Sequence, residues 1–214
     1  MGRPVIGITA PTRMTKWGPW DMDATVIPAT YALAVMEGGG IPVILPPEDG
    51  AIDVISAIDG LVISGGPDIN PSMYGAELDP DTLDTYPNQD RREIALIKAS
   101  IDADLPVLGI CRGMQMLNYW SGGKLNKVSN YVGKSHRILP TVNIKNWPRK
   151  VECYHKLAIS KCPPDFDIKA IYEDGIIAAI KHKFLPWEGW MWHPEREENS
   201  IEINSNRLKN LFNK

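Results

Sequence analysis

The sequence predicts an α/β fold with a doubly wound, mostly parallel sheet and helices on both of its faces. Short apolar runs of the length of buried strands alternate along the chain with segments of helical periodicity, which is typical of a parallel sheet. The chain has 214 residues, of which 43% are hydrophobic and 23% are charged. That size and composition suit one domain, residues 1–214, with a sizeable core.

The first elements can be followed from the N-terminus. Val5–Thr9 is an apolar run and is predicted to be the first strand, with a turn-rich loop at residues 17–23 after it. Pro28–Met36 is predicted to be a helix, because proline is tolerated in a first helical turn. Ile41–Leu45 is predicted to be the second strand, and the proline pair that follows ends it.

The next elements repeat this alternation. Ile52–Ile58 is predicted to be a short helix, and Gly60–Ser64 the third strand. Residues 67–90 form a polar stretch rich in Pro, Asp and Asn, and long loops in compact domains are often functional. Arg91–Ile101 has apolar residues at helical spacing, and Val107–Ile110 is a continuous apolar strand.

The last third of the chain is predicted to be richer in strands. The expected β-rich region is 123–185, with strands near Val151–Tyr154, Ile168–Tyr172 and Ile176–Lys181, and a further strand is expected at Gly189–Trp192. Ligands of parallel sheets bind beyond the carboxyl ends of the strands. Ser64, Cys111 and His193 each stand at such an end, so we expect them to share a site.

Cys111 is a candidate nucleophile. It ends the apolar strand and is followed at once by helix-forming residues, so its side chain is expected to project above the sheet, as on a nucleophile elbow. Gly109 and Gly113 flank it, and glycine allows the close packing that a sharp elbow needs. A helix N-terminus also lowers the pKa of a thiol. The alternative is a small buried residue at a strand end, where free cysteines are common.

His193 and Glu195 supply the remaining groups of a triad. They follow the apolar strand in Gly189-Trp-Met-Trp-His193-Pro-Glu195. If the chain turns, the carboxylate orients one nitrogen of the imidazole and leaves the other free to deprotonate a thiol. The alternatives are a surface histidine and one member of a charged run.

These motifs together resemble the class I glutamine amidotransferases, and more closely their γ-glutamyl hydrolase branch, peptidase family C26. The resemblance rests on Gly-x-Cys111-Arg-Gly-x-Gln115, on the segment Ser64-Gly-Gly-Pro-Asp-Ile-Asn-Pro-Ser-Met-Tyr-Gly75, and on Trp192-His-Pro-Glu195. It spans nearly the whole chain and implies a flavodoxin-like sheet. The second part also resembles γ-glutamyl-CDP-amidate hydrolases associated with bacterial capsule biosynthesis.

The resemblance implies a role for each matching residue. Cys111 would form a γ-glutamyl thioester, His193 would transfer protons, and Glu195 would orient His193. Backbone N–H groups of Arg112 and Gly66 would stabilise the oxyanion. The residues implied for substrate binding are Gly65, Gln115, Tyr154 and His155, although Tyr154 and Lys156 depart from the family pattern around His155.

The implied activity is hydrolysis of a γ-glutamyl amide to glutamate and an amine, with γ-glutamyl-γ-aminobutyrate as the default substrate. A nucleotide-linked γ-glutamyl amide is the rival, and Lys124, Lys127, Lys134 and Arg137 are candidates to meet its phosphate. Basic groups near the site would favour the rival, and a small apolar pocket would favour the default. A glutaminase subunit that feeds ammonia to a partner synthase and a non-catalytic binding homologue stay as alternatives.

Composition limits the partners and the location. The net charge of −3 gives no sign of nucleic-acid binding, and no stretch approaches the ~20 apolar residues of a membrane span. Three cysteines without metal-ligand spacing and an N-terminus without a signal-peptide pattern predict a cytoplasmic protein. No cofactor and no metal are expected, since acyl transfer needs only a nucleophile, a base and oxyanion donors. The expected partner is a small-molecule γ-glutamyl substrate, and a homodimer is left open.

The tryptophans are numerous and have two expected places. Trp17 and Trp20 are candidates for the wall of the substrate pocket, since they stand in the turn-rich loop. Trp190 and Trp192 alternate on a predicted strand and are expected in the core.

The two parts of the chain differ in charge. Residues 1–107 carry 6 Lys and Arg against 16 Asp and Glu, whereas residues 108–214 carry 17 against 10. One interpretation is a charge dipole within one domain, and the other is a chimera of two homologues joined near the elbow. Under either interpretation, both parts must complete one sheet.

Overall fold

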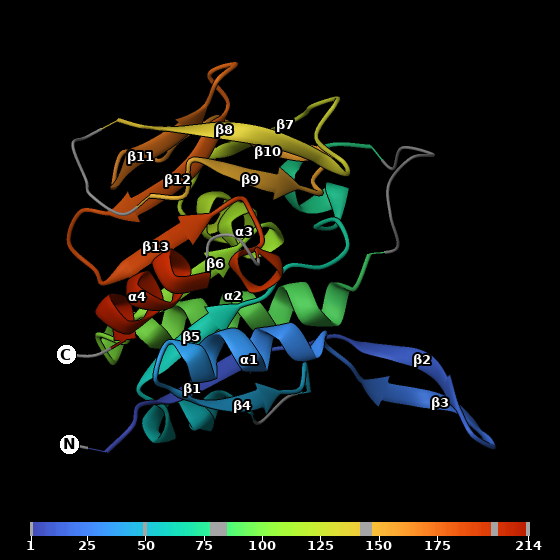
Figure 1. The fold of residues 1–214 in the computed structure, drawn as a ribbon. Coiled ribbons are helices and arrows are strands. Elements are labelled where there is room, and N and C mark those ends of the chain that lie inside the picture. The colour runs from blue at the N-terminus through green and yellow to red at the C-terminus, as the bar shows by residue number, and fades with distance from the viewer. Residues whose placement is uncertain (1, 49–50, 78–84, 142–146, 198–200, 213–214) are drawn as a thin grey trace.

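The protein folds around a single large sheet. The computed structural model describes residues 2–48, 51–77, 85–141, 147–197 and 201–212 (Figure 1). Within these residues nine strands form the sheet, in the order β4-β1-β5-β6-β13-β12-β11-β8-β9. Their bounds are β1 Val5–Thr9, β4 Ile41–Leu45, β5 Gly60–Ile63, β6 Val107–Ile110, β8 Lys134–Pro140, β9 Lys150–Cys153, β11 Phe166–Tyr172, β12 Ile177–His182 and β13 Trp187–Trp190.

The sheet has a parallel half and an antiparallel half. Strands β4, β1, β5, β6 and β13 pair in parallel, and β12, β11, β8 and β9 continue the sheet in antiparallel pairing. The predicted α/β class is therefore confirmed, with an antiparallel extension. Strand β6 lies between β5 and β13, so strands from both parts of the chain complete one sheet, as expected. The chimera hypothesis itself stays a prediction.

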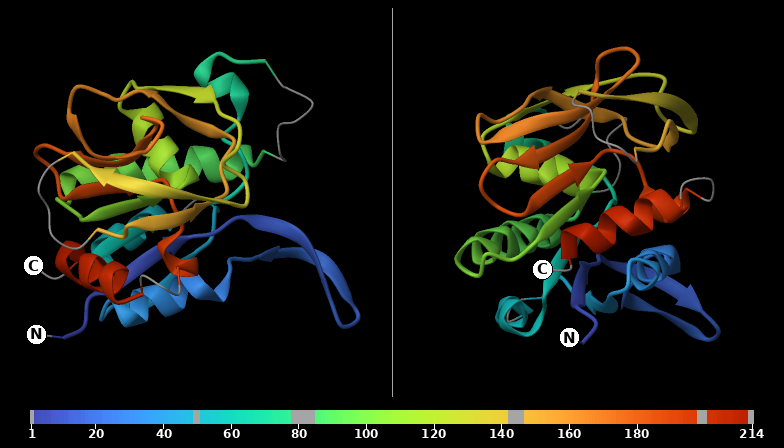
Figure 2. Two further views of the ribbon diagram at one scale, coloured as in Figure 1. Left: turned by 45° about the horizontal axis from the view of Figure 1, so that its top comes forward. Right: turned by 60° about the vertical axis from the view of Figure 1, so that its left-hand side comes forward.

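Helices cover both faces of the parallel half (Figure 2). The helices are α1 Ala29–Glu37, α2 Pro87–Asp102, α3 Arg112–Trp120 and α4 Ile201–Phe212. Helix α1 packs against α4, and α2 packs against α3, on opposite sides of the strands. None of the helices in the described residues is both long and apolar enough to cross a bilayer.

The core between these layers is made mainly of strand residues. Ile6, Leu61 and Leu108 on adjacent parallel strands are completely buried. Trp190 and Trp192 are also completely buried and their rings stack with centroids 5.3 Å apart, which confirms their predicted place in the core.

The structure differs from the predicted elements at the N-terminal loop. Instead of a loop at residues 17–23, β2 (Thr12–Trp17) and β3 (Trp20–Thr25) form a hairpin that extends from the body (Figure 1). Gly18 at its tip has a φ of 54°, which glycine adopts without strain. The glycine and proline of the turn make the whole segment resemble a loop, although residues 12–17 and 20–25 pair throughout.

Other differences are smaller. The helix predicted at 52–58 is a 3₁₀ helix over Ala51–Ala57, and the one predicted at 91–101 starts four residues earlier, at Pro87. Part of the expected polar loop at 67–90 is a 3₁₀ helix, Pro71–Tyr74, while residues 78–84 lie outside the described residues. The β-rich region is confirmed, and two of its strands, β7 (Lys124–Lys127) and β10 (Leu157–Lys161), form a separate small sheet.

Candidate active site

Cys111 stands on a sharp turn between β6 and α3. Its φ of 52° and ψ of −105° are strained for a residue with a side chain, and such strain is a common property of functional sites. The backbone N–H of Cys111 donates to the carbonyl of Trp190 over 2.8 Å, which extends the β6–β13 pairing to the turn itself. The thiol therefore lies at the carboxyl edge of the parallel half.

The two flanking glycines are required by close packing. A Cβ atom on Gly113 would lie 2.0 Å from the carbonyl oxygen of Ile63, and one on Gly109 would lie 2.6 Å from the backbone of Gly113. Helix α3 can therefore begin directly against β5 and β6 only because both positions lack a side chain, which confirms the packing predicted for them.

His193 and Glu195 are joined by a short hydrogen bond. His193 follows β13, and the 3₁₀ helix Pro194–Arg196 turns the chain so that Glu195 Oε1 lies 2.6 Å from His193 Nδ1. Both side chains are buried. The ring of His193 also makes a side-chain hydrogen bond with Cys111. One imidazole thus connects a carboxylate and a thiol.

The electrostatic environment keeps His193 charged. Burial lowers the pKa of His193, but the negative charge of Cys111 and the hydrogen bonds to Cys111 and Glu195 outweigh burial and raise this pKa to about 10. At neutral pH the ring therefore carries a proton that it can give to a neighbouring atom.

Gly65 lies where three functional groups converge. Its N–H donates to the phenol oxygen of Tyr31 on α1 over 2.9 Å. A Cβ atom at Gly65 would lie 2.7 Å from His193 Cε1, 2.8 Å from Tyr31 Oη and 3.6 Å from Cys111 Cβ. The N–H of Gly65 is thus already engaged, while Gly66 has more room, with Arg112 Cδ 3.5 Å from the position of its Cβ.

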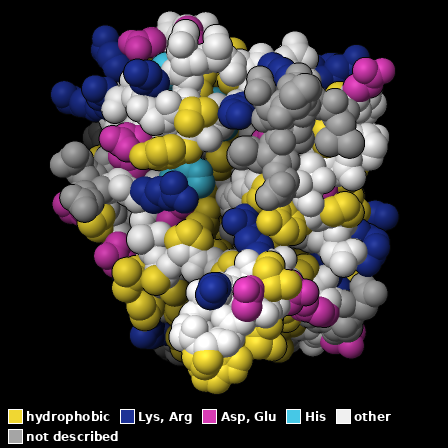
Figure 3. All heavy atoms as spheres, turned by 90° about the vertical axis from the view of Figure 1, so that its right-hand side faces the viewer, with side chains coloured by type: hydrophobic (Ala, Val, Ile, Leu, Met, Phe, Trp, Pro, Cys, Tyr) yellow, Lys and Arg dark blue, Asp and Glu magenta, His cyan; other side chains and the backbone are white. Residues whose placement is uncertain are grey.

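A cavity of about 350 Å³ opens in front of Cys111, and we call it the cysteine cavity. Its apolar wall contains Val26, Ile27 and Pro28, and two arginines, Arg13 and Arg196, add positive charge. Figure 3 views the carboxyl edge of the sheet and shows a histidine ring between hydrophobic and basic side chains. The remaining lining residues are Pro11, Tyr31, Gly65, Gly66, Cys111, Tyr154 and His193.

A buried ionic network anchors the residue after the cysteine. The guanidinium of Arg112 pairs with Asp90 and with Glu93 of α2, and all three side chains are almost completely inaccessible. Glu93 also accepts a hydrogen bond from Thr9 Oγ1 at the end of β1 over 2.8 Å. The pairing with two carboxylates raises the pKa of Arg112 although burial lowers it. The network fixes the first turn of α3 to α2 and to β1.

The residues expected to bind substrate occupy two different places. Tyr154 lines the cysteine cavity, where its ring lies 5.9 Å from that of His193. Gln115 and His155 are buried outside the lining of this cavity. Gln115 Nε2 donates to the carbonyl of Leu157, and His155 Nδ1 donates to the same oxygen. Burial lowers the pKa of His155 to about 4, so this ring is neutral.

Several sequence predictions for the cavity do not match its lining. Trp17 and Trp20, the candidates for its wall, lie exposed at the tip of the hairpin. The basic candidates are also elsewhere: Lys127 and Lys134 line another cavity of about 400 Å³, and Lys124 and Arg137 lie exposed on β7 and β8.

Tyr31, Arg13 and Arg196 are not identified by the sequence patterns. The first two lie on a helix and a hairpin remote from the motifs, and no local pattern marks them. Arg196 directly follows Glu195, so its place beside the site could be predicted from the Glu195 motif. Among the described residues, no group of three or more His, Cys, Asp or Glu side chains could hold a metal ion.

Comparison with known proteins identifies the family of the chain. A sequence model of the family described as peptidase C26 matches residues 4–146 and 134–195. A Mycobacterium tuberculosis protein named "Putative glutamine amidotransferase Rv2859c" is 34% identical over 227 residues, which cover 94% of this chain and 72% of that protein. A γ-glutamyl-CDP-amidate hydrolase of Campylobacter jejuni is 31% identical over 150 residues, with 68% of each chain covered.

The fold is also found in solved structures. The crystal structure of a glutamine amidotransferase from Methylobacillus flagellatus superposes with a TM-score of 0.62 at 18% identity, over 94% of this chain and 74% of the other. The length of the family match and the identity to the mycobacterial relative settle the classification. This chain belongs to the peptidase C26 family, a glutamine amidotransferase-like family of hydrolases.

Proposed function

We propose that the protein is a cysteine-dependent amidohydrolase that cleaves γ-glutamyl amides to glutamate and an amine. The observation that carries this proposal is that Cys111 and His193 line one cavity, while the buried carboxylate of Glu195 is hydrogen-bonded to His193 Nδ1. A nucleophile, a proton-transfer group and an orienting carboxylate are the parts that acyl transfer from an amide requires.

In the proposed first step, Cys111 Sγ attacks the γ-carbonyl carbon and the C–N bond breaks. His193, protonated at neutral pH because its pKa is raised to about 10, gives its proton to the departing nitrogen. Water then attacks the thioester, His193 takes a proton from it, and glutamate leaves. Glu195 holds the ring through the 2.6 Å hydrogen bond to Nδ1.

Two backbone donors are proposed for the oxyanion. Arg112 is the first residue of α3, and the first N–H groups of a helix have no acceptor within the helix. Gly66 is the second donor, since the N–H of Gly65 is engaged by Tyr31. Each such donor is typically worth about 100-fold or more in rate.

The glutamyl moiety is proposed to lie on the side of Gln115. Both Gln115 and His155 donate to the carbonyl of Leu157, so they fix the loop that joins β9 to β10. In this proposal Gly65 and Tyr154 contact substrate directly, and Gln115 and His155 shape the loop behind it.

The leaving amine is proposed to carry negative charge. Arg13 and Arg196 both line the cysteine cavity, and a guanidinium binds carboxylate or phosphate well. γ-Glutamyl-γ-aminobutyrate meets this condition through its carboxylate, and a γ-glutamyl-CDP-amidate meets it through its phosphates. The relative from Campylobacter jejuni carries the second activity in its name.

The test is glutamate release by the purified protein and by Cys111→Ala on glutamine, γ-glutamyl-γ-aminobutyrate and γ-glutamyl-CDP-amidate. Turnover of an anionic amide that disappears in Cys111→Ala supports the proposal. No turnover, with Cys111 still alkylated by an electrophilic glutamine analogue, would favour a glutaminase subunit that awaits a synthase. Failure of both turnover and labelling would favour a non-catalytic homologue.

A further inference from the structure

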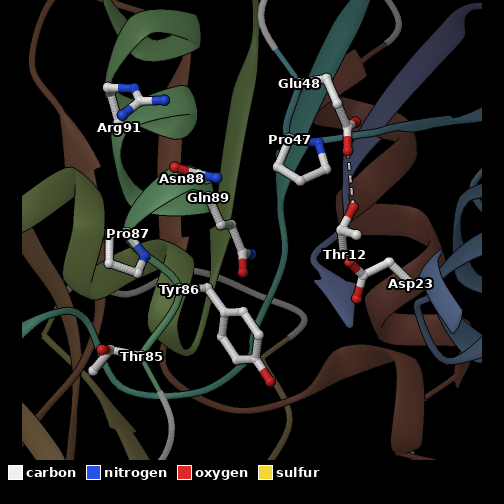
Figure 4. A pocket seen from close by; sticks show the side chains of 10 residues that line it. All are labelled: Thr12, Asp23, Pro47, Glu48, Thr85, Tyr86, Pro87, Asn88, Gln89 and Arg91. Carbon is white, nitrogen blue, oxygen red and sulfur yellow. Dashed lines mark hydrogen bonds between the residues drawn. The ribbon is translucent and has the colours of Figure 1, made fainter. Parts of the chain in front are cut away.

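A second cavity of about 580 Å³ lies beside the base of the hairpin (Figure 4). We call it the Tyr86 cavity. It is bounded by the start of β2, by the loop after β4 and by the N-terminus of α2. The lining residues used below are Thr12, Asp23, Glu48, Tyr86 and Gln89.

The Tyr86 cavity adjoins the cysteine cavity. Pro11 and Arg13 line the cysteine cavity, while Thr12 between them lines the Tyr86 cavity. Side chains alternate in direction along an extended chain, so this one segment separates the two spaces. The guanidinium of Arg13 also lies 5.1 Å from the centre of the Tyr86 ring. A group that leaves the cysteine cavity past Arg13 therefore meets Tyr86.

Gln89 provides an unused acceptor at the Tyr86 cavity. The side chain is 2% exposed, and its Nε2 donates to Glu93 Oε1 over 3.0 Å, which fixes the orientation of the amide. Its Oε1 has no hydrogen-bond partner within the described residues. Figure 4 shows the amide end directed toward Tyr86. A buried acceptor in this position can take an N–H or O–H donor from a ligand that fills the cavity.

The charges of the two cavities are opposite in character. Arg13 and Arg196 line the cysteine cavity. Two acidic residues, Asp23 and Glu48, line the Tyr86 cavity together with one basic residue, Arg91. Carboxylates accept hydrogen bonds from hydroxyl groups and disfavour phosphate. The acidic cavity with its aromatic ring thus suits a sugar and a flat base, and the basic cavity suits phosphate.

We propose that the Tyr86 cavity binds the nucleoside part of a leaving group whose phosphate lies at Arg13 and Arg196. The assignment rests on the proposed γ-glutamyl hydrolase function and names its substrate class, a γ-glutamyl phosphoramidate of a nucleotide. The base stacks on Tyr86 and its N–H group donates to Gln89 Oε1. The ribose hydroxyls donate to Asp23 and Glu48.

The hydrolysis of such a substrate balances with water alone. Cys111 breaks the bond between the γ-carbonyl carbon and the amide nitrogen, and the P–N bond stays intact. Water supplies the hydroxyl of the glutamate carboxyl group, and the amide nitrogen gains the proton. The second product is therefore a nucleotide phosphoramidate with a free amino group.

The experiment compares two substrates on the full-length protein: γ-glutamyl-CDP-amidate and γ-glutamyl-γ-aminobutyrate, which has no nucleoside. We expect Tyr86→Ala to lower kcat/KM about tenfold or more on the nucleotide substrate and to affect the small one much less. Tyr86→Phe, which keeps the ring, should stay near wild type. Asp23→Asn should lower kcat/KM a few-fold on the nucleotide substrate, whereas Asp21→Asn on the same strand should not.

Binding of CDP, followed by calorimetry, gives a second readout that does not depend on turnover. We expect CDP to bind the wild type and to bind Tyr86→Ala at least tenfold more weakly. The inference is overturned if both substrates are hydrolysed but Tyr86→Ala affects them equally, or if CDP binds Tyr86→Ala as well as wild type. If neither substrate is hydrolysed, the proposed hydrolase function fails, and CDP binding that depends on Tyr86 would still identify the cavity as a nucleotide site.

Discussion

The two walls of the cysteine cavity are built in different ways. The inner wall consists of Gly65, Cys111 and His193, which follow three adjacent parallel strands and are tied to the core by hydrogen bonds and close contacts. The outer wall consists of the hairpin, Tyr154 and Arg196, whose side chains are partly exposed, Tyr154 by 39%. The inner wall therefore tolerates little change in geometry, whereas the outer wall can vary with the amine that leaves.

The largest predicted effect comes from filling the space at Gly65. In Gly65→Ala the new methyl group would lie 2.7 Å from His193 Cε1 and 2.8 Å from Tyr31 Oη, so the His193 ring or the Tyr31 phenol must shift. We expect kcat/KM for glutamate release to fall roughly 100-fold, because misplaced reacting groups are costly. Gly66→Ala is the control, because it keeps the backbone N–H proposed for the oxyanion and the nearest contact of its new methyl group is 3.5 Å, so its loss should be much smaller. Equal losses in the two variants would contradict this account of the inner wall.

The second prediction concerns the network that holds Arg112. Glu93→Gln leaves a buried guanidinium with one carboxylate partner, Asp90. Breaking one half of a buried ion pair typically costs about 3–5 kcal/mol, so urea unfolding should show a loss of that size. Asp167→Asn removes an exposed pair with Lys169 and should cost about 1 kcal/mol or less. A loss below about 1 kcal/mol in Glu93→Gln would show that the inner wall does not depend on the network.

The third prediction tests the proton on His193. The proposed mechanism needs the charged ring, and its raised pKa of about 10 keeps the ring charged until the pH approaches that value. Glu195→Gln removes a group that raises this pKa, so the pKa falls. The alkaline decline of kcat/KM should then move to lower pH by about one unit or more. Glu202→Gln at the start of α4 serves as the control. If kcat/KM of Glu195→Gln declines at the same alkaline pH as that of wild type, the prediction is wrong.

The smallest predicted effect belongs to the outer wall. Arg196→Ala should raise KM about tenfold for amides with an anionic leaving group, because the variant lacks the partly exposed guanidinium that is proposed to bind that charge. KM for glutamine, whose leaving group is uncharged, should stay nearly unchanged. High salt should shrink the difference between wild type and variant. Arg149→Ala, an exposed arginine outside the cavity, should behave as wild type. An equal rise in KM for glutamine in Arg196→Ala would contradict the view that the outer wall acts on the leaving amine.

The same contrast explains what could be predicted from the sequence. The parallel strands, the elbow at Cys111 and the positions of His193 and Glu195 follow from local patterns, because a strand end fixes where the next side chain lies. The hairpin resembles a loop in sequence because Gly18 and Pro19 interrupt it, although Trp20, Met22 and Ala24 alternate with polar residues as in a strand.

Residues of the outer wall have no such pattern. Arg13 reaches the cavity only because β2 leaves β1 at this point. The same holds for Tyr31 beside Gly65, which depends on the packing of α1 against the 3₁₀ helix Pro194–Arg196. The lysines predicted to meet a phosphate lie away from the cysteine cavity, because composition gives the sign of a charge but not its direction. The predicted roles of Gln115 and His155 stay predictions.

The pairing of β6 with β13 also affects how the chain folds during synthesis on the ribosome. Strand β6 and Cys111 are synthesised well before β13, so the N–H of Cys111 has no access to the carbonyl of Trp190 until β13 is made. Until then one edge of β6 is unpaired, and open strand edges favour association between nascent chains. When β13 pairs with β6, this edge is covered and His193, which follows β13, is placed beside the thiol. Cys111 therefore gains its proton-transfer partner only after the strands have paired.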